Sequence, residues 1–428
     1  MNRSFFTHTL GCKVNAYESE ALATELIAKG WHKADKDETP GLIVLNTCSV
    51  TGKADQKSRQ HISSFRKRYP DAVLLVMGCY SQTHEQEAAS LGADIVLGAS
   101  KRALTAGYIE SFLETGAQII DVKPNLRHET YESLSSISLT DKTRAYLKIQ
   151  DGCDNFCSYC FIPQLRGNSR SRDPREVVEE AKALVEAGNK EIVLTGIHIG
   201  GYGKDLADGS FRLSDLIASI LNKVPNLWSL RISSIEESEI DDRLLSLLAT
   251  QKRIANHLHV PLQSGSSSVL QRMKRHYDTE AFLKKLDAIR EVRPDIAITT
   301  DVIAGFPLES EEEWAETLSF CEKANFAEIH VFPFSSRPKT YAATLPDTKP
   351  EIKKRRVAEL LALSKKQRRA YEEKFYGKEL EVLIEEIDEG RGVAKGHTSN
   401  YFLVSVPAGD LQKGYIIKVV YESSIASD

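Results

Sequence analysis

Short apolar runs alternate with amphipathic stretches through residues 1–125. The apolar runs are typical of buried strands and lie at Phe5 to Leu10, Leu42 to Leu45 and Ala72 to Met77. Between them, Glu18 to Lys29 and Ala54 to Tyr69 have helical periodicity. Strands that alternate with helices are typical of βαβ units, in which the strands are parallel. We therefore expect an α/β fold that begins with a doubly wound parallel-sheet domain.

The alternation stops at residues 126–143, which are polar and rich in serine and are predicted to be a linker. It resumes over residues 144–370 with six candidate strands: Tyr146 to Ile149, Glu191 to Leu194, Trp228 to Ile232, His257 to Val260, Ile296 to Ile303 and Glu328 to Val331. One helix has a start signal at Asp173 and Pro174 and an expected end at Gly188. Six strand–helix units predict a partial (β/α)6 barrel with its chemistry at the carboxyl ends of the strands.

The last segment, residues 374–428, has short apolar runs separated by glycine-containing turns, which predict a small antiparallel β-barrel. A basic helix precedes it, because residues 349–378 contain eleven Lys or Arg against four Glu. Its apolar residues recur at helical spacing and predict one buried face: Val357, Leu360, Leu361, Tyr371 and Phe375.

The charged side of this helix has two interpretations. Lys and Arg favour helices and can form a simple solvated face. Alternatively, they would contact nucleic-acid phosphates without reading sequence. The candidates for such RNA contacts are Lys353, Lys354, Arg355, Arg356, Lys365, Lys366, Arg368 and Arg369.

Composition limits the class of protein. The chain has 428 residues, a net charge of −4 and seven cysteines, an odd number that makes a poor disulfide framework. The apolar runs are too short to span a bilayer, and the first residues lack a secretory signal. We therefore expect a cytoplasmic protein with reduced thiols and no membrane partner.

Three of the cysteines form the sharpest motif, Cys153-Asp-Asn-Phe-Cys157-Ser-Tyr-Cys160, directly after a predicted strand. Three thiolates can hold three irons of a 4Fe–4S cluster and leave the fourth iron open to another ligand. A zinc site is the alternative, with His198 in the next loop as the fourth ligand. The spacing favours the iron–sulfur site.

A second set of cysteines follows the first three strands, at Cys12, Cys48 and Cys79. Equivalent ends of parallel strands converge on the edge where open α/β sheets bind ligands. We therefore expect a second metal cluster there, although three buried thiols packed as small apolar groups remain the alternative. The seventh cysteine, Cys321, lies on an amphipathic helix and is expected to be a core residue.

The CxxxCxxC spacing resembles that of the radical S-adenosylmethionine superfamily. Leu194-Thr-Gly-Ile-His198 and Val302-Ile-Ala-Gly-Phe-Pro307 are similar to its later strand-end motifs. The resemblance implies a radical cluster on Cys153, Cys157 and Cys160, which are the catalytic residues, and a bound S-adenosylmethionine that is cleaved to a 5′-deoxyadenosyl radical. It implies the following residues as contacts of that cofactor: Tyr159, Gly196, Ser233, Gln263 and Gly305.

Two three-cysteine sets followed by a small barrel resemble the methylthiotransferase family over nearly the whole chain. Further matches are Gly11-Cys-Lys-Val-Asn15, Asn46-Thr-Cys48, Pro163-Gln-Leu-Arg-Gly167 and Pro261-Leu-Gln-Ser-Gly-Ser266. The resemblance implies an auxiliary 4Fe–4S cluster on Cys12, Cys48 and Cys79 that carries the inserted sulfur. It also implies a terminal RNA-binding domain of the TRAM type.

Within that family the chain is most similar to the enzymes that methylthiolate C2 of N6-threonylcarbamoyladenosine in tRNA, through Lys395-Gly-His-Thr-Ser-Asn-Tyr401 among other segments. The implied partners are tRNA, a sulfur donor and an electron donor such as flavodoxin or ferredoxin. Alternatives within the family are isopentenyladenosine in tRNA and an aspartate of a ribosomal protein. An alternative of another class is a non-catalytic, metal-bound RNA-binding protein.

Overall fold

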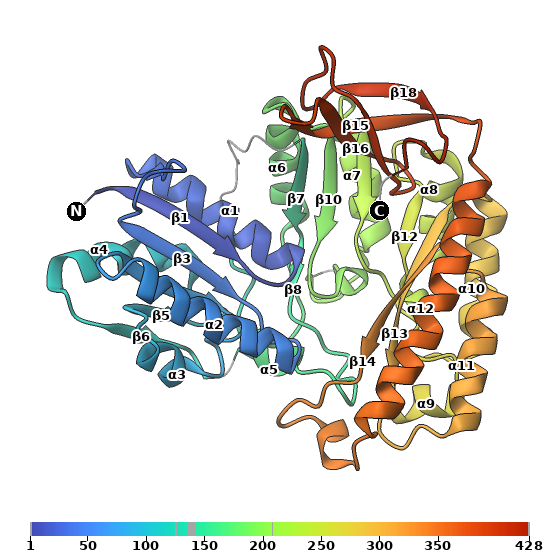
Figure 1. Cartoon of the computed structure of the whole chain (residues 1–428), viewed down its shortest axis with the longest axis horizontal. Coiled ribbons are helices and arrows are strands. Elements are labelled where there is room, and N and C mark those ends of the chain that lie inside the picture. The colour runs from blue at the N-terminus through green and yellow to red at the C-terminus, as the bar shows by residue number, and fades with distance from the viewer. Residues whose placement is uncertain (1, 125, 135–142, 208, 427–428) are drawn as a thin grey trace.

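The computed structural model describes residues 2–124, 126–134, 143–207 and 209–426. Figure 1 shows three parts: an N-terminal α/β domain, a central curved sheet with helices on its outside, and a small sheet that covers one end of the centre. Part of the predicted linker, residues 135–142, lies outside the described residues. In the described part of the chain, no helix is long and apolar enough to cross a membrane.

The N-terminal domain is a parallel sheet of strand order β2-β1-β3-β4-β5-β6. Leu22, Leu26 and Ile109 of helices α1 and α4 pack on one face, and Ile62 and Ala88 of α2 and α3 pack on the other. The prediction of a doubly wound sheet is confirmed. The elements are β1 Ser4–Thr9, α1 Lys13–Ala28, β2 His32–Lys33, β3 Leu42–Thr47, α2 Gly52–Arg68, β4 Val73–Gly78, α3 Glu85–Ser90, β5 Ile95–Leu97, α4 Thr105–Thr115 and β6 Ile119–Asp121.

The central domain contains the six predicted strands, all parallel. They form two three-stranded sheets, β11-β10-β7 and β12-β13-β14, which isolated bridges at Leu230–Ile254 and Ser234–His259 join into one curved surface. The partial barrel is thereby confirmed. The strands are β7 Arg144–Lys148, β10 Glu191–Thr195, β11 Ser229–Ile232, β12 His257–His259, β13 Ala297–Ala304 and β14 Glu328–Pro333.

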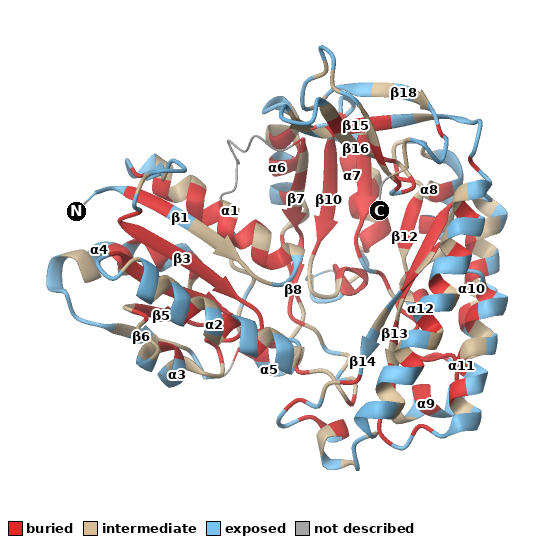
Figure 2. Cartoon of the chain, viewed as in Figure 1, coloured by how far each residue is buried: buried red, intermediate tan, exposed pale blue. Residues whose placement is uncertain are grey.

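Helices cover the outside of the barrel, and Figure 2 shows buried strands behind helices whose outer faces are exposed. Helix α6 begins after Asp173, whose side chain accepts a hydrogen bond from the Arg175 amide, and Gly188 follows it with a φ of +101°. The predicted start and end signals are confirmed. The helices are α5 Ile162–Arg166, α6 Pro174–Glu186, α7 Leu213–Lys223, α8 Asp242–Thr250, α9 Ser267–Arg272, α10 Thr279–Val292, α11 Glu311–Ala324 and α12 Pro350–Glu373.

The C-terminal domain is a four-stranded antiparallel sheet of order β17-β16-β15-β18, built from β15 Glu379–Asp388, β16 Val393–Thr398, β17 Leu403–Pro407 and β18 Ile416–Val420. Its core includes Tyr371 and Phe375 from the end of α12. Strand β16 was not predicted, because Lys395, Gly396 and His397 break its apolar pattern. Leu361 is 49% exposed, so it is not part of the buried face expected for α12.

Candidate metal centres and substrate cavities

The first cysteine set lies at one edge of the N-terminal sheet. Cys12 precedes α1, Cys48 follows β3 and Cys79 follows β4, as the strand pattern predicts. All three are free thiols. Cys12 is exposed, and Cys48 and Cys79 are buried. The surrounding protein desolvates the Cys12 thiol enough to raise its pKa, burial raises the pKa of Cys48 to about 11, and repulsion from Cys79 raises both further. The three sulfur atoms are therefore close enough to interact, and a bound metal would have to displace their protons.

The backbone before Cys12 leaves no space for a side chain. Gly11 has a φ of +97°, and a Cβ built on it would lie 2.8 Å from Cβ and 2.9 Å from Sγ of Cys48. Only glycine combines this dihedral angle with this close approach at low cost. Gly11 thus holds the Cys12 and Cys48 loops together.

Gly11→Ala is expected to lower the iron content of the reconstituted protein at this site by at least half, because Cys48 must move. Iron analysis and the 4Fe–4S absorbance measure the effect. Gly107→Ala is the control, since a Cβ at that position meets no atom within 4 Å. If Gly11→Ala binds as much iron as the wild type, this account of Gly11 is incorrect.

The second cysteine set lies in the loop that follows β7 and the short strand β8 (Gln150–Asp151), at a carboxyl end of the barrel. The Cys160 amide donates to the Cys157 carbonyl over 3.0 Å, and Arg275 donates to Sγ of Cys157 over 3.1 Å. Burial raises the pKa of Cys157, and the positive charge of Arg275 offsets part of this increase. Burial raises the pKa of Cys160 to about 12. Cys153 and Cys157 also interact with Cys160, so the three thiols form one group.

His198 lies beside this group. Its Nε2 is 2.9 Å from Glu239. Burial lowers the pKa of His198, but hydrogen bonds to Cys153 and Glu239 outweigh burial and raise it to about 10. The loop itself provides three free thiols, which fits a cluster with three protein ligands.

A buried ionic network connects the two cysteine sets. Arg166, six residues after Cys160, donates from Nε to Sγ of Cys79 over 3.4 Å and from Nη1 to Glu18 over 2.6 Å. Lys148 is 2.8 Å from Glu18 and 2.7 Å from Asp151. Burial would raise the pKa of Glu18, but Arg102, Arg166 and Lys148 lower it to about 2. The two domains are thus fixed to each other where their cysteine loops meet.

A cavity of about 250 Å³, which we call the central cavity, opens beside Cys160 and the residues that follow Cys48. Val50 and Thr51, just after Cys48, line one side and Cys160 lines the other. Its other lining residues include two of the predicted cofactor contacts, Tyr159 and Gln263, together with Asp301.

The other three predicted cofactor contacts have different surroundings. A Cβ on Gly196 would lie 2.9 Å from the Gln150 carbonyl, so this glycine allows close backbone packing at the end of β10. Ser233 lines a different cavity. The Gly305 amide donates to Glu309 over 2.9 Å, and Lys353 occupies the space beside its Cα. The local role of Gly305 is therefore to make a turn.

A second cavity of about 200 Å³, the lateral cavity, opens beside the barrel between all three domains. Lys13 from α1, Arg231 and His257 from the barrel, and Tyr401 from the C-terminal domain are among its lining residues. Burial lowers the pKa of Lys13, and Arg231 and Arg144 lower it further. The sequence pattern did not assign Lys13 or Arg231 to a common site, because they are far apart along the chain and only the fold joins them.

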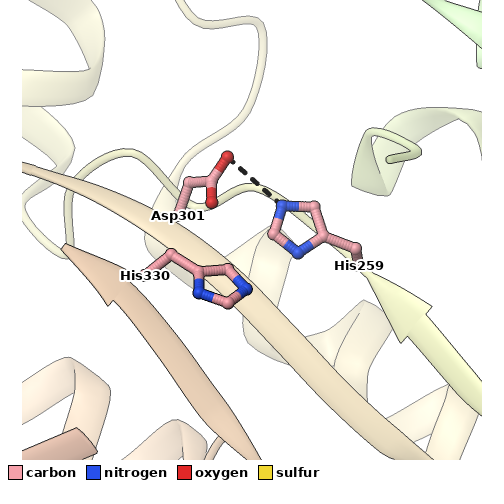
Figure 3. Close-up of side chains that lie close together, drawn as sticks. All are labelled: His259, Asp301 and His330. Carbon is pink, nitrogen blue, oxygen red and sulfur yellow. Dashed lines mark ion pairs between the residues drawn. The ribbon is translucent and has the colours of Figure 1, made fainter. Parts of the chain in front are cut away.

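Three side chains form the wall between the two cavities. His259, Asp301 and His330 have ligand atoms within 4.8 Å of one another. The Nε2 of His259 forms an ion pair with Asp301 at 3.2 Å. Figure 3 shows the two imidazoles and the carboxylate turned toward each other. Asp301 lines the central cavity, and His259 and His330 line the lateral one. The two cavities are therefore neighbours.

The basic residues of α12 do not form one free surface. Arg356 is buried and ion-paired with Glu309 at 2.6 Å, so it is withdrawn from the expected RNA contacts. Four others have carboxylate partners, namely Lys353, Arg355, Arg368 and Arg369. Within the described residues, Lys354, Lys365 and Lys366 are exposed and have no carboxylate partner.

Comparison with known proteins agrees with this architecture. Residues 4–98 match the uncharacterized protein family UPF0004, and residues 147–321 match the radical SAM superfamily. The chain is 43% identical to the Bacillus subtilis threonylcarbamoyladenosine tRNA methylthiotransferase MtaB, over 96% of this chain and 92% of that protein. It is 32% identical to the tRNA-2-methylthio-N(6)-dimethylallyladenosine synthase of the same organism, over 97% of this chain and 83% of that protein.

Among solved structures, the radical S-adenosylmethionine methyltransferase TsrM from Kitasatospora setae has a TM-score of 0.59 at 15% identity, covering 80% of this chain and 77% of that one. This likeness shows the shared fold. A partial barrel with a CxxxCxxC loop, behind a parallel-sheet domain with three further cysteines, defines a radical S-adenosylmethionine protein with an additional metal-binding domain.

The chain belongs to the radical S-adenosylmethionine methylthiotransferase family and is a transferase. The cofactors of this family are S-adenosylmethionine and two 4Fe–4S clusters. Both three-cysteine sets fit such a cluster, because each offers three free thiols at one sheet edge and has an arginine that donates to a sulfur atom.

Proposed function

We propose that the protein adds a methylthio group to C2 of N6-threonylcarbamoyladenosine in tRNA. The observation that carries the proposal is one cavity lined by Cys160 of the radical set and by Val50 and Thr51, which follow Cys48, in a chain 43% identical to a protein named for that reaction. Identity to the protein named for dimethylallyladenosine is lower, at 32%. The threonylcarbamoyl substrate is therefore favoured over the isopentenyl one.

In this proposal, Cys153, Cys157 and Cys160 hold the radical cluster, and Cys12, Cys48 and Cys79 hold the auxiliary one. When bound, these groups supply reductive cleavage of S-adenosylmethionine and a sulfur site for methyl transfer. The protein supplies orientation and water exclusion: Arg275 and Arg166 each donate to a cluster sulfur, which stabilises its negative charge. Tyr159 and Gln263 line the cavity where adenine and cofactor would meet.

An electron donor would approach through a third hollow, the outer groove, of about 740 Å³. This groove reaches Cys157 and Cys160 and is lined by Lys274 and Lys339. Phe156 and Tyr341, both exposed, also line it. Basic residues with exposed aromatic rings fit an acidic redox protein such as flavodoxin or ferredoxin. A sulfur donor would serve the auxiliary cluster.

The tRNA would contact α12 and the C-terminal sheet, which we propose is a TRAM-like RNA-binding domain. Tyr401 extends from this sheet to the barrel, where the Arg231 guanidinium lies 4.6 Å from its ring centroid. A base drawn out of the anticodon loop could then reach the cavities.

Replacing Lys365 and Lys366 together by alanine is expected to weaken tRNA binding and to reduce the slope of log affinity against log salt by about 1 to 2, because each lysine would contact one phosphate. Filter binding at several salt concentrations measures this slope. Arg356→Ala is a poor probe, because it removes a buried ion pair. An unchanged slope in the double variant would remove these lysines from the RNA contact surface.

The function is tested with anaerobically reconstituted protein, S-adenosylmethionine, a reductant, and anticodon stem-loops that carry either threonylcarbamoyladenosine or isopentenyladenosine. We expect methylthiolation of the first. Methylthiolation of isopentenyladenosine alone would contradict the proposal. About eight irons per chain would exclude the non-catalytic, zinc-bound alternative.

A further inference from the structure

The lateral cavity has more positive than negative charge among the groups that line it. Three of its lining residues are basic, namely Lys13, Arg231 and Arg368, and Glu328 is the only lining carboxylate among the described residues. Arg231 is bound by Glu191 from behind the cavity, at 3.0 Å. Arg368 is 3.0 Å from Glu372 and 3.4 Å from Glu328. Both guanidinium groups therefore have carboxylate partners.

Lys13 is the exception. In the described part of the chain it makes no hydrogen bond and no ion pair, although it is only partly exposed and lines the cavity. A partly buried ammonium group without a partner is costly unless an anion or water completes it. The cavity thus has an open position for one negative charge.

His257 offers a second polar group to the same cavity. Its ring is buried, and its Nδ1 has no hydrogen-bond partner in the described structure. Burial lowers the pKa of His257 well below its ordinary value, and Arg231, His259 and Lys13 lower it further. A neutral imidazole can offer this nitrogen to a polar ligand. Tyr401 stacks on the same ring, with centroids 5.1 Å apart, and closes this side of the cavity.

We infer that the lateral cavity binds the carboxylate-bearing N6 substituent of the target adenosine, with Lys13 as the residue that pairs with the carboxylate. This inference rests on the proposed function and identifies the specificity-determining residue of the same site. It assigns His257 and His330 as further polar contacts around the substituent.

The relative position of the two cavities supports this assignment. The His259–Asp301 ion pair separates them, so they are one side chain apart. In adenine, C2 and C6 both flank N1, so a base with C2 in the central cavity would direct its N6 group into a neighbouring space. Lys13 directly follows Cys12, which places the ammonium group beside the auxiliary set. An isopentenyl group carries no charge and would leave Lys13 unpaired.

The test compares binding of three anticodon stem-loops by the anaerobic holoenzyme. They carry threonylcarbamoyladenosine, its neutral methyl ester, or isopentenyladenosine. The wild type is expected to bind the carboxylate form roughly 10- to 100-fold more tightly than the ester, as loss of one charge-assisted hydrogen bond predicts. Lys13→Gln should abolish this preference with little effect on ester binding, and Lys13→Arg should restore part of it.

Controls separate this inference from a structural effect and from the proposed function. Lys33→Gln, at an exposed lysine of β2 in the same domain, should keep the preference. Iron content and S-adenosylmethionine cleavage show whether Lys13→Gln retains both clusters. His330→Ala provides a second variant, because His330 is distant in sequence from every cysteine of the two sets. Equal wild-type binding of carboxylate and ester, with methylthiolation of both, would overturn the inference alone. Methylthiolation of isopentenyladenosine only would overturn the function as well.

Discussion

Replacing Cys153, Cys157 or Cys160 by alanine is expected to abolish reductive cleavage of S-adenosylmethionine, with a loss of at least 1,000-fold or to background. Each thiol would hold one iron of the radical cluster, so its loss leaves the cluster with two protein ligands. The formation of 5′-deoxyadenosine, followed by chromatography, is the measurement.

The matched variants are Cys12→Ala, Cys48→Ala and Cys79→Ala. They should spare cleavage within a few-fold and abolish methylthio product, because the auxiliary set lies in the N-terminal domain, apart from the loop that holds the radical set. Cys321→Ala is the control, since Cys321 is fully buried in α11 and belongs to the core. If Cys48→Ala still forms the methylthiolated product, the auxiliary-cluster assignment is incorrect.

Arg166→Ala is expected to destabilise the protein by about 3–5 kcal/mol, because it leaves two buried carboxylates with fewer partners. Arg166 has no exposed side-chain surface and binds Glu18 at 2.6 Å and Asn15 at 2.6 Å. The same variant removes the donor to Cys79 and should lower iron retention at the auxiliary site. Denaturant unfolding under anaerobic conditions gives the change in free energy.

Arg175→Ala is the control for this prediction. Its ion pair with Asp173 is at the surface, with 87% of the arginine side chain exposed. Such exposed pairs contribute little to stability. If Arg166→Ala and Arg175→Ala are equally stable, the buried network does not fix the two domains to each other.

The sequence contains strong local signals for both cysteine sets. Cys12, Cys48 and Cys79 each follow an apolar run, and strand ends of a parallel sheet must meet at one edge. The second set lies within eight residues, at Cys153, Cys157 and Cys160. One loop therefore brings these thiols together regardless of the fold of the rest of the chain. For this reason the sheet, the barrel and the six candidate ligands could all be predicted from pattern.

Sites made by distant residues could not be predicted in this way. The lateral cavity joins Lys13, Arg231, His330 and Tyr401 from three domains, and no periodicity connects them. The incorrect prediction that Arg356 of α12 contacts RNA has a different cause. Arg356 lies on the same helical face as Leu360 and Gln367, and all three are buried. Its position on that face decides its burial, whereas its charge had suggested an exposed position.

The central claim is that this chain methylthiolates threonylcarbamoyladenosine in tRNA. Mass spectrometry of tRNA nucleosides, from cells with and without the protein, tests it most directly. The account predicts that 2-methylthio-N6-threonylcarbamoyladenosine disappears without the protein and returns with the wild type, but not with Cys48→Ala. An unchanged level of that nucleoside, with loss of the methylthiolated isopentenyl nucleoside instead, would contradict it.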